Sequence, residues 1–191
     1  TVDDLALCRA AGARVLCVTK AYQAALWADW AYACDPKWWH HYGPDVRARF
    51  HGERWTQRQP PQFNGTDYIP DEVACCERFN LHWMPSATKV GLGDDCIHLS
   101  TGGSGYHAIN LAYLFGATRI VLIGYDAGMT GGRKHFDGKD YPVSVGESGG
   151  WGPGCREGYP ALVKDLGRAG VELINCSRET LLTAVPRKPL E

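Results

Sequence analysis

The sequence has no surplus of either charge and no long apolar run. Its 191 residues include 20 Lys and Arg and 21 Asp and Glu, for a net charge of -1. General nucleic-acid binding would favour a basic surplus, so the composition does not indicate it. No apolar run approaches the roughly 20 residues of a membrane-spanning helix, and no secretory signal pattern is present. We therefore predict a cytoplasmic protein without a membrane span.

The eight cysteines lack the spacing of a metal or redox centre. None forms a CxxC pair, and none groups with histidine at zinc-finger spacing. Cys17, Cys34 and Cys176 lie in apolar runs, where cysteine behaves as a small hydrophobic residue. We expect free thiols and no metal site, with some disulfides as the alternative.

Strand-like apolar runs alternate with helical patterns along the chain. Strands are expected at 14–19, 30–35, 119–124 and 171–176, and helices at 3–11, 21–27, 37–50, 106–115 and 159–170. Residues 51–95 are less regular, although 79–84 fits a strand or an edge segment. The alternation predicts an α/β fold, a Rossmann-like three-layer α/β/α arrangement with a mostly parallel sheet. The length predicts a single domain over residues 1–191.

Residues 126–158 form the longest stretch without a helix or strand pattern. This stretch holds ten glycines in 33 residues. A loop of that length in a compact domain is usually functional, so we predict a lid-like role.

Polar or glycine-containing residues follow several predicted strands. In open parallel sheets, ligands bind beyond the carboxyl ends of the strands. The candidates are Thr19 and Lys20, Asp35, the turn at 100–105, and Gly124, Tyr125 and Asp126. Together they predict a small-molecule site at this edge of the sheet.

A glycine-rich turn precedes the helix expected at 106–115. Its residues are Thr101, Gly102, Gly103, Ser104 and Gly105. Glycine lets backbone N–H groups approach a ligand, and a helix N-terminus favours an anion such as phosphate. The alternative is a tight turn with Ser104 as the N-cap. The spacing matches neither GxGxxG nor the P-loop.

Two acids and a histidine are candidates for chemistry. Asp126 and Asp35 follow strands and are suited to hydroxyl or metal contacts, although both also fit turn residues. His135 lies beside Arg133 and Lys134 in the glycine-rich stretch, a combination suited to base catalysis and phosphate neutralisation. A solvated loop is the alternative. His107 faces either the site or the surface.

An aromatic cluster lies early in the chain, at Trp27, Trp30, Trp38, Trp39 and Tyr42. Such rings stack on a base or sugar. Core packing or contact between copies of the chain is the more usual role, so a homo-oligomer is an alternative.

The stretch from Ser104 to Asp126 resembles a known superfamily. It is similar to bacterial sialyltransferases with one Rossmann-like nucleotide-binding domain, in the turn Ser104-Gly105, the helix end at Gly116 and the run 123–126. The layout also resembles 6-hydroxymethylpterin pyrophosphokinase-like proteins and sequences from tailed phages. Looser matches lie at 18–22 and 33–36. The resemblance implies a phage-type member, which would act in the host cytoplasm.

The sequence departs from this family in three places. The family's first strand and its G-x-G-P-S phosphate loop have no counterpart, as if the chain lacked its first strand. The family's catalytic histidine before the last long helix is absent from GPGCREGYPAL. Ala127 and Gly128 replace the tyrosine that follows the S-G-x-D motif.

The resemblance implies a nucleotide-binding transferase, with a nucleotide-sugar-dependent glycosyltransferase as the leading interpretation. The donor would be a CMP- or UDP-type sugar, and His135 or Asp126 would be the base. Arg133, Lys134 and Arg156 would stabilise the leaving phosphate, and Tyr159 would donate a hydrogen bond to it. Two alternatives remain open: a pyrophosphokinase-like enzyme that uses ATP and Mg²⁺, and a non-catalytic nucleotide-binding module.

Overall fold

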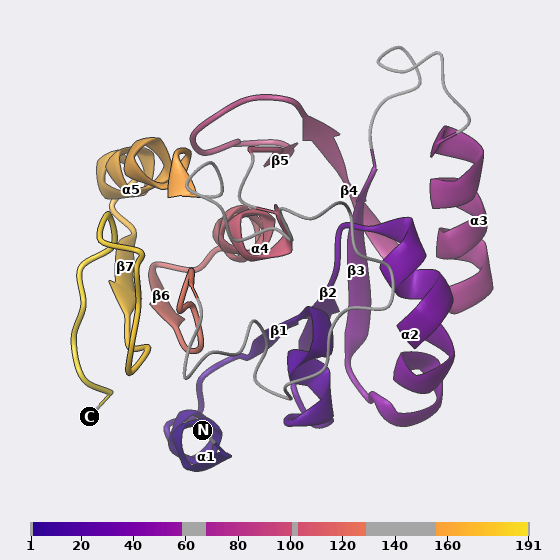
Figure 1. Cartoon of the computed structure of the whole chain (residues 1–191), viewed down its shortest axis with the longest axis horizontal. Coiled ribbons are helices and arrows are strands. Elements are labelled where there is room, and N and C mark those ends of the chain that lie inside the picture. The colour runs from indigo at the N-terminus through magenta and orange to yellow at the C-terminus, as the bar shows by residue number, and fades with distance from the viewer. Residues whose placement is uncertain (1, 59–67, 101–102, 129–155, 191) are drawn as a thin grey trace. The chain divides into compact units, whose positions relative to one another are not determined.

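The chain divides into two compact units (Figure 1). The computed structural model describes residues 2–58, 68–100, 103–128 and 156–190. Unit 1 comprises Thr1–Ala87 and Asp95–Ile97, and unit 2 comprises Thr88–Asp94 and His98–Glu191. Each unit is described by itself.

Unit 1 is built on a parallel sheet. The sheet has the strand order β1-β2-β3-β4-β5. Its strands are β1 (Leu16–Val18), β2 (Trp30–Tyr32), β3 (Glu53–Arg58), β4 (His82–Ala87) and β5 (Ile97–His98), and the unit boundary falls within β5. The helical elements of this unit are α1 (Val2–Ala10), the 3-10 helix η1 (Thr19–Gln23), α2 (Pro36–Arg49) and α3 (Tyr68–Phe79).

Helix α2 begins where local sequence signals coincide. The Asp35 carboxylate accepts a hydrogen bond from the Lys37 backbone N–H at 2.8 Å, and Pro36 occupies the first helical position. Trp38 and Trp39 are buried in the core. Helices α2 and α3 lie side by side (Figure 1), where Gly43 leaves room for the ring of Phe79. Val46 of α2 and Cys75 and Phe79 of α3 are buried.

The described part of unit 2 contains a pair of parallel strands and two helices. The elements are α4 (Gly103–Leu114), β6 (Arg119–Leu122), α5 (Tyr159–Arg168) and β7 (Glu172–Asn175). The helices end shortly before Gly116 and Gly170, which have positive φ values of 85° and 74°. Glycine accepts this left-handed conformation without a Cβ clash, so each helix gives way to the strand that follows. The core gathers Tyr106, Ile109, Leu122, Leu162 and Leu166.

The predicted fold class is confirmed: the protein is α/β with a parallel sheet, consistent with a Rossmann-like fold. The single domain over 1–191 stays a prediction. The helix expected at 21–27 is wrong, because Thr19–Gln23 form a 3-10 helix instead. Sequence analysis also missed β3 and α3. β3 reads ERWTQR, which has no apolar alternation, and pairing with β2 and β4 places it in the sheet.

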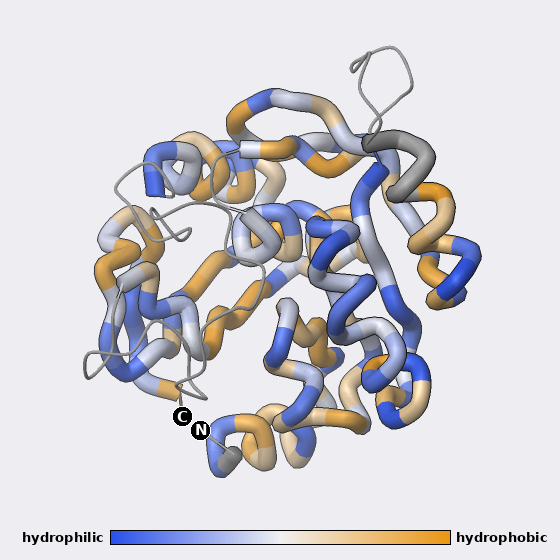
Figure 2. The backbone as a smooth tube through the Cα atoms, turned by 45° about the vertical axis from the view of Figure 1, so that its right-hand side comes forward, coloured by the Kyte–Doolittle hydropathy of each residue, from blue (hydrophilic) through white to orange (hydrophobic). Residues whose placement is uncertain are grey.

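The distribution of hydropathy along the chain (Figure 2) agrees with the lack of long apolar runs in the sequence. Hydrophobic and hydrophilic residues alternate in short stretches along the tube (Figure 2). Within the described ranges, none of the helices combines the length and hydropathy needed to cross a membrane. Among the described residues, no disulfide is present at Cys8, Cys17, Cys34, Cys75, Cys76, Cys96 or Cys176.

Candidate functional site

The sequence-predicted site residues fall into three groups. Thr101, Gly102, Arg133, Lys134 and His135 lie outside the described residues, as does most of the predicted lid-like loop. Unit 1 holds Thr19, Lys20 and Asp35. Unit 2 holds Gly103, Ser104, Gly105, Gly124, Tyr125, Asp126, Arg156 and Tyr159.

In unit 2, the N-terminus of α4 meets the segment that follows β6. The Tyr125 hydroxyl donates a hydrogen bond to the Gly105 carbonyl oxygen at 3.1 Å. A Cβ on Gly105 would lie 3.1 Å from Cε1 of Tyr125 and 3.6 Å from the Tyr159 hydroxyl. The missing side chain therefore lets two tyrosines approach the first turn of α4. Sequence analysis placed these residues at one site, and three of them are in contact.

Hydrogen bonds to backbone groups hold the segment after β6 in place. Gly124 and Ala127 have positive φ values of 75° and 51°. The Tyr125 N–H donates to Ser177 Oγ at 2.7 Å, and the Asp126 carbonyl accepts from the Leu181 N–H at 2.7 Å. Thr180 Oγ1 donates to the Tyr125 carbonyl at 2.7 Å. These bonds fix the position of the half-buried Asp126.

Two further residues of this region are Arg156, which precedes α5, and Tyr159, the first residue of α5. The Arg156 guanidinium donates a hydrogen bond to the Ala127 carbonyl at 3.2 Å, and Ala127 is the residue after Asp126. Tyr159 is buried, and its ring packs edge-on against Tyr106 with centroids 5.3 Å apart. Burial, with a smaller contribution from Tyr159, raises the pKa of Tyr125, so its hydroxyl remains a hydrogen-bond donor.

His107 lies one turn into α4 and faces the interior. It is 5% exposed, and burial lowers its pKa to about 4 despite a hydrogen bond with the Ser100 backbone. The imidazole is therefore neutral near pH 7, as a core residue rather than a charged site residue.

In unit 1, the carboxyl ends of β1 to β4 carry buried polar side chains. Lys20 is 4% exposed and follows Thr19, whose φ of 49° is unusual for a β-branched residue. The Asp35 carboxylate caps α2 as described above. The polar character expected at these strand ends is therefore present.

Gln57 and Ser86 are polar residues of this edge that sequence analysis missed. The Ser86 hydroxyl donates to Gln57 Oε1 at 2.5 Å, and Gln57 Nε2 donates to the Cys34 carbonyl at 3.4 Å. Both side chains are buried. The sequence patterns did not predict β3 as a strand, so they did not place Gln57 at a strand end beside Ser86.

The aromatic cluster separates into two environments. Trp38 and Trp39 are buried in the core, and the Trp39 indole donates to the Ala33 carbonyl at 3.0 Å. Trp27 and Trp30 are half-buried and line an open cavity. Core packing therefore accounts for two of the tryptophans, and ligand contact remains available to the other two.

Within the part of the chain that the structure describes, no group of three or more His, Cys, Asp or Glu side chains is placed to hold a metal ion. No protein-family model, curated protein or solved structure matches the chain.

Proposed function

We propose that unit 2 binds the phosphate of a nucleotide at the N-terminus of α4, and that the protein is a nucleotide-sugar-dependent transferase. The observation that carries the proposal is the convergence of Gly105, Tyr125 and Tyr159, with Asp126 on the segment after β6 and Arg156 hydrogen-bonded to that segment. These residues come from three separate parts of the sequence. Their meeting at one helix end favours a ligand site over an isolated turn.

The first turn of α4 supplies the anion-binding chemistry. The leading N–H groups of a helix have no intrahelical acceptor, and the helix dipole favours negative charge there. Gly103 has a positive φ of 60° and, like Gly105, has no side chain to shield the backbone. Arg156 adds a cation near the same segment. This combination suits the phosphates of a CMP- or UDP-type donor.

The proposed reaction is a direct displacement. An acceptor hydroxyl oxygen bonds to the anomeric carbon of the sugar as the carbon–oxygen bond to the donor phosphate breaks. The hydroxyl proton passes to Asp126 or His135, and the bonding electrons leave with the phosphate. Arg156, with Arg133 and Lys134, stabilises the charge on the leaving group, and Tyr159 donates a hydrogen bond to it.

Calorimetric titration of the full chain with CMP, CDP, UDP and ATP tests the binding step. We expect one of the cytidine or uridine nucleotides to bind without Mg²⁺, and Asp126→Ala to weaken that binding at least about tenfold without unfolding the chain. Glu179→Ala is the control, since it removes an exposed acid and changes net charge equally.

Three results would count against the proposal. Absence of binding by every nucleotide contradicts it, as does unchanged affinity in Asp126→Ala. Binding that requires both ATP and Mg²⁺ favours the pyrophosphokinase-like alternative instead.

A further inference from the structure

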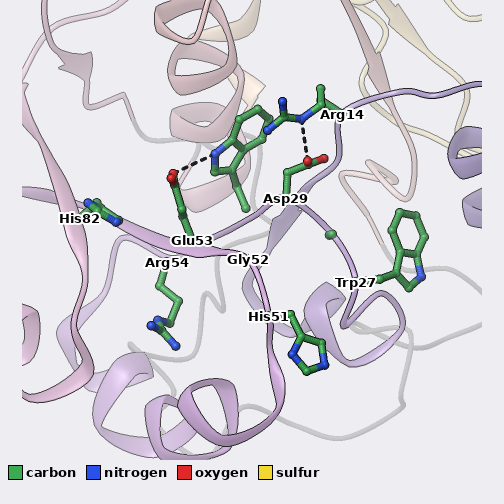
Figure 3. Close-up of a pocket in the computed structure, with 10 residues that line it drawn as sticks. Arg14, Trp27, Asp29, His51, Gly52, Glu53, Arg54 and His82 are labelled. Atoms are coloured by element: carbon green, nitrogen blue, oxygen red, sulfur yellow. Dashed lines mark hydrogen bonds and ion pairs between the residues drawn. The ribbon is translucent and has the colours of Figure 1, made fainter.

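An open cavity of about 430 Å³ lies at the amino ends of β1 to β4 in unit 1 (Figure 3). This amino-edge cavity is opposite the carboxyl ends where ligands of parallel sheets are expected, so the proposed nucleotide site does not account for it. Its size falls in the range of small-molecule sites. The lining side chains that matter here are Arg14, Asp29, Trp30, Glu53, Arg54 and His82.

Four side chains form a row across three strands on one side of the sheet. Trp30 on β2 is the register partner of Glu53 on β3, and Trp55 is the register partner of His82 on β4. Register partners face the same side, as do residues two apart on one strand, so all four share that side. Arg54 projects to the other side (Figure 3) and is not part of the row. A ligand that contacts the row therefore meets Glu53 and not Arg54.

Glu53 is an oriented acceptor within this row. Its Oε2 accepts the indole N–H groups of Trp30 at 3.1 Å and Trp55 at 2.9 Å. Both bonds end on the same oxygen, and the described residues give Oε1 no hydrogen bond. The two indoles therefore fix the carboxylate of this exposed residue and leave one of its oxygens to accept from a ligand.

Arg14 and His82 flank the row at its two ends. The Arg14 guanidinium lies 4.5 Å from the Trp30 ring centroid, and its Nε pairs with Asp29 at 2.6 Å. The Arg14 side chain is 67% exposed, so its terminal N–H groups are accessible as donors. At the other end, the exposed His82 ring stacks on Trp55 with centroids 5.0 Å apart. The cavity thus offers an acceptor with donors close to it.

This pattern limits the chemistry of the ligand. A ligand that contacts both Glu53 and Arg14 must donate to the first and accept from the second. A hydroxyl does both, whereas an ammonium or guanidinium only donates and a phosphate or carboxylate only accepts. Adjacent hydroxyls on a sugar ring supply both roles within one small molecule.

We propose that the amino-edge cavity binds a neutral monosaccharide, whose hydroxyls donate to Glu53 Oε1 and accept from Arg14, with His82 at the edge of the site. The site belongs to unit 1 and uses none of the residues of the proposed nucleotide site. Neither proposal depends on the other.

Titration of the ¹⁵N-labelled full chain, followed by NMR, tests the proposal. The indole N–H groups of Trp30 and Trp55 contact Glu53, so their signals report on the site, and Trp30→Phe and Trp55→Phe assign them. The probes are glucose, galactose and mannose. We expect at least one of them to shift both signals and to reach saturation at millimolar concentration. Methylguanidinium and inorganic phosphate, at the same ionic strength, test the two charged alternatives.

Glu53→Gln assigns the binding to the oriented carboxylate. Only the oxygen of the new amide can accept from the two indoles, so its NH₂ group replaces Oε1 and presents donors instead of an acceptor. We expect hexose binding to weaken about tenfold or more, with a melting temperature close to that of the unchanged protein. Glu77→Gln is the matched control, because Glu77 is exposed on α3, outside the cavity lining, and loses the same charge.

The proposal is overturned if none of the three hexoses shifts the indole signals, or if Glu53→Gln binds them as tightly as the unchanged protein. Tighter binding of methylguanidinium or inorganic phosphate than of every hexose would also overturn it, since a charged ligand would then fit better. Equal weakening in Glu77→Gln would show that net charge, and not the oriented carboxylate, controls binding.

Discussion

Two regions differ in whether their buried polar groups are hydrogen-bonded. One is the face of α4 that carries Tyr106 and Asn110, in unit 2, and the other is the cavity at the amino ends of β1 to β4, in unit 1. On the α4 face, the Asn110 amide accepts the N–H groups of Gly93 and His98 and donates to the Gly93 carbonyl, each at 3.0 Å. Nearby, the Tyr106 hydroxyl exchanges hydrogen bonds with the Gly91 backbone. In the cavity, the buried Nε of Arg54 has no such bond among the described residues.

This difference separates buried polar groups that stabilise the fold from a buried polar group that does not. A buried polar side chain that is fully hydrogen-bonded stabilises one conformation, because breaking its bonds leaves several groups desolvated and unpaired. A buried guanidinium nitrogen without a hydrogen bond lowers the stability of the folded protein, because it loses water without gaining a partner. The following variants test whether the two regions differ in this way, in order of decreasing effect.

The largest effect is expected for Asn110→Leu. The substitution leaves two N–H groups and one carbonyl buried without their bonds, at about 1–3 kcal/mol each. We expect a loss of at least about 3 kcal/mol in the free energy of unfolding, measured by urea denaturation. Tyr113→Phe, on the same helix but at its surface, should change stability little. A loss below about 1 kcal/mol in the free energy of unfolding for Asn110→Leu would show that the hydrogen bonds of Asn110 contribute little to stability.

His107, also on α4, should make stability depend on pH. Its folded pKa of about 4 lies below the unfolded value near 6.5, so the unfolded chain binds more protons between these values. Stability is therefore fully present above about pH 6.5 and falls as the pH drops toward 4, by about 3 kcal/mol in total. Urea denaturation across this range should show a flatter profile for His107→Phe than for the unchanged protein. Identical profiles would mean that His107 is not desolvated.

Gly105→Ala tests the close approach at the α4 N-terminus. Its Cβ would lie 3.1 Å from the Tyr125 ring, so we expect a loss of about 1–2 kcal/mol and weaker nucleotide binding. Gly167→Ala on α5 is the matched control. Its Cβ would meet nothing within 4 Å, so we expect a gain of about 0.5–1 kcal/mol. Thermal unfolding of the pair measures the contrast, and equal shifts would contradict it.

The smallest effect, and the opposite sign, is expected for Arg54→Met. Removing the guanidinium, whose buried Nε has no hydrogen-bond partner among the described residues, should raise the free energy of unfolding by up to about 1 kcal/mol, measured by urea denaturation. A loss of more than about 1 kcal/mol would show that Arg54 is a structural residue and would remove the contrast with Asn110.

Sequence patterns located the elements whose apolar content is strong. β6 and β7 are found within the ranges expected for them, and Gly116 and Gly170 follow their helices as predicted. Gly105 and Tyr125, two of the predicted site residues, are in contact, and the site itself stays a prediction. β3 could not be found in this way, because its sequence ERWTQR has no apolar alternation. Its place in the sheet is set by pairing with β2 and β4.

The amino-edge cavity was also beyond sequence analysis. Its lining comes from four separate segments at the starts of β1, β2, β3 and β4, and none of them carries a recognisable motif. Trp30 and Trp38 lie eight residues apart in one aromatic cluster, yet one lines the cavity and the other is buried. Composition cannot make that distinction, because it depends on where folding places the first residue of β2 and the first turn of α2.

The sequence by itself determined the α/β class and the parallel sheet, whereas Gly103 to Gly105, expected as a turn before the helix, form the first turn of α4. The class and the sheet follow from local periodicity and from conformations that only particular residues adopt readily. The tertiary structure decided which polar groups are paired and which are not. Asn110 and Arg54 are both polar residues within regular elements, but hydrogen bonding depends on neighbours distant in sequence, and only folding brings those neighbours together.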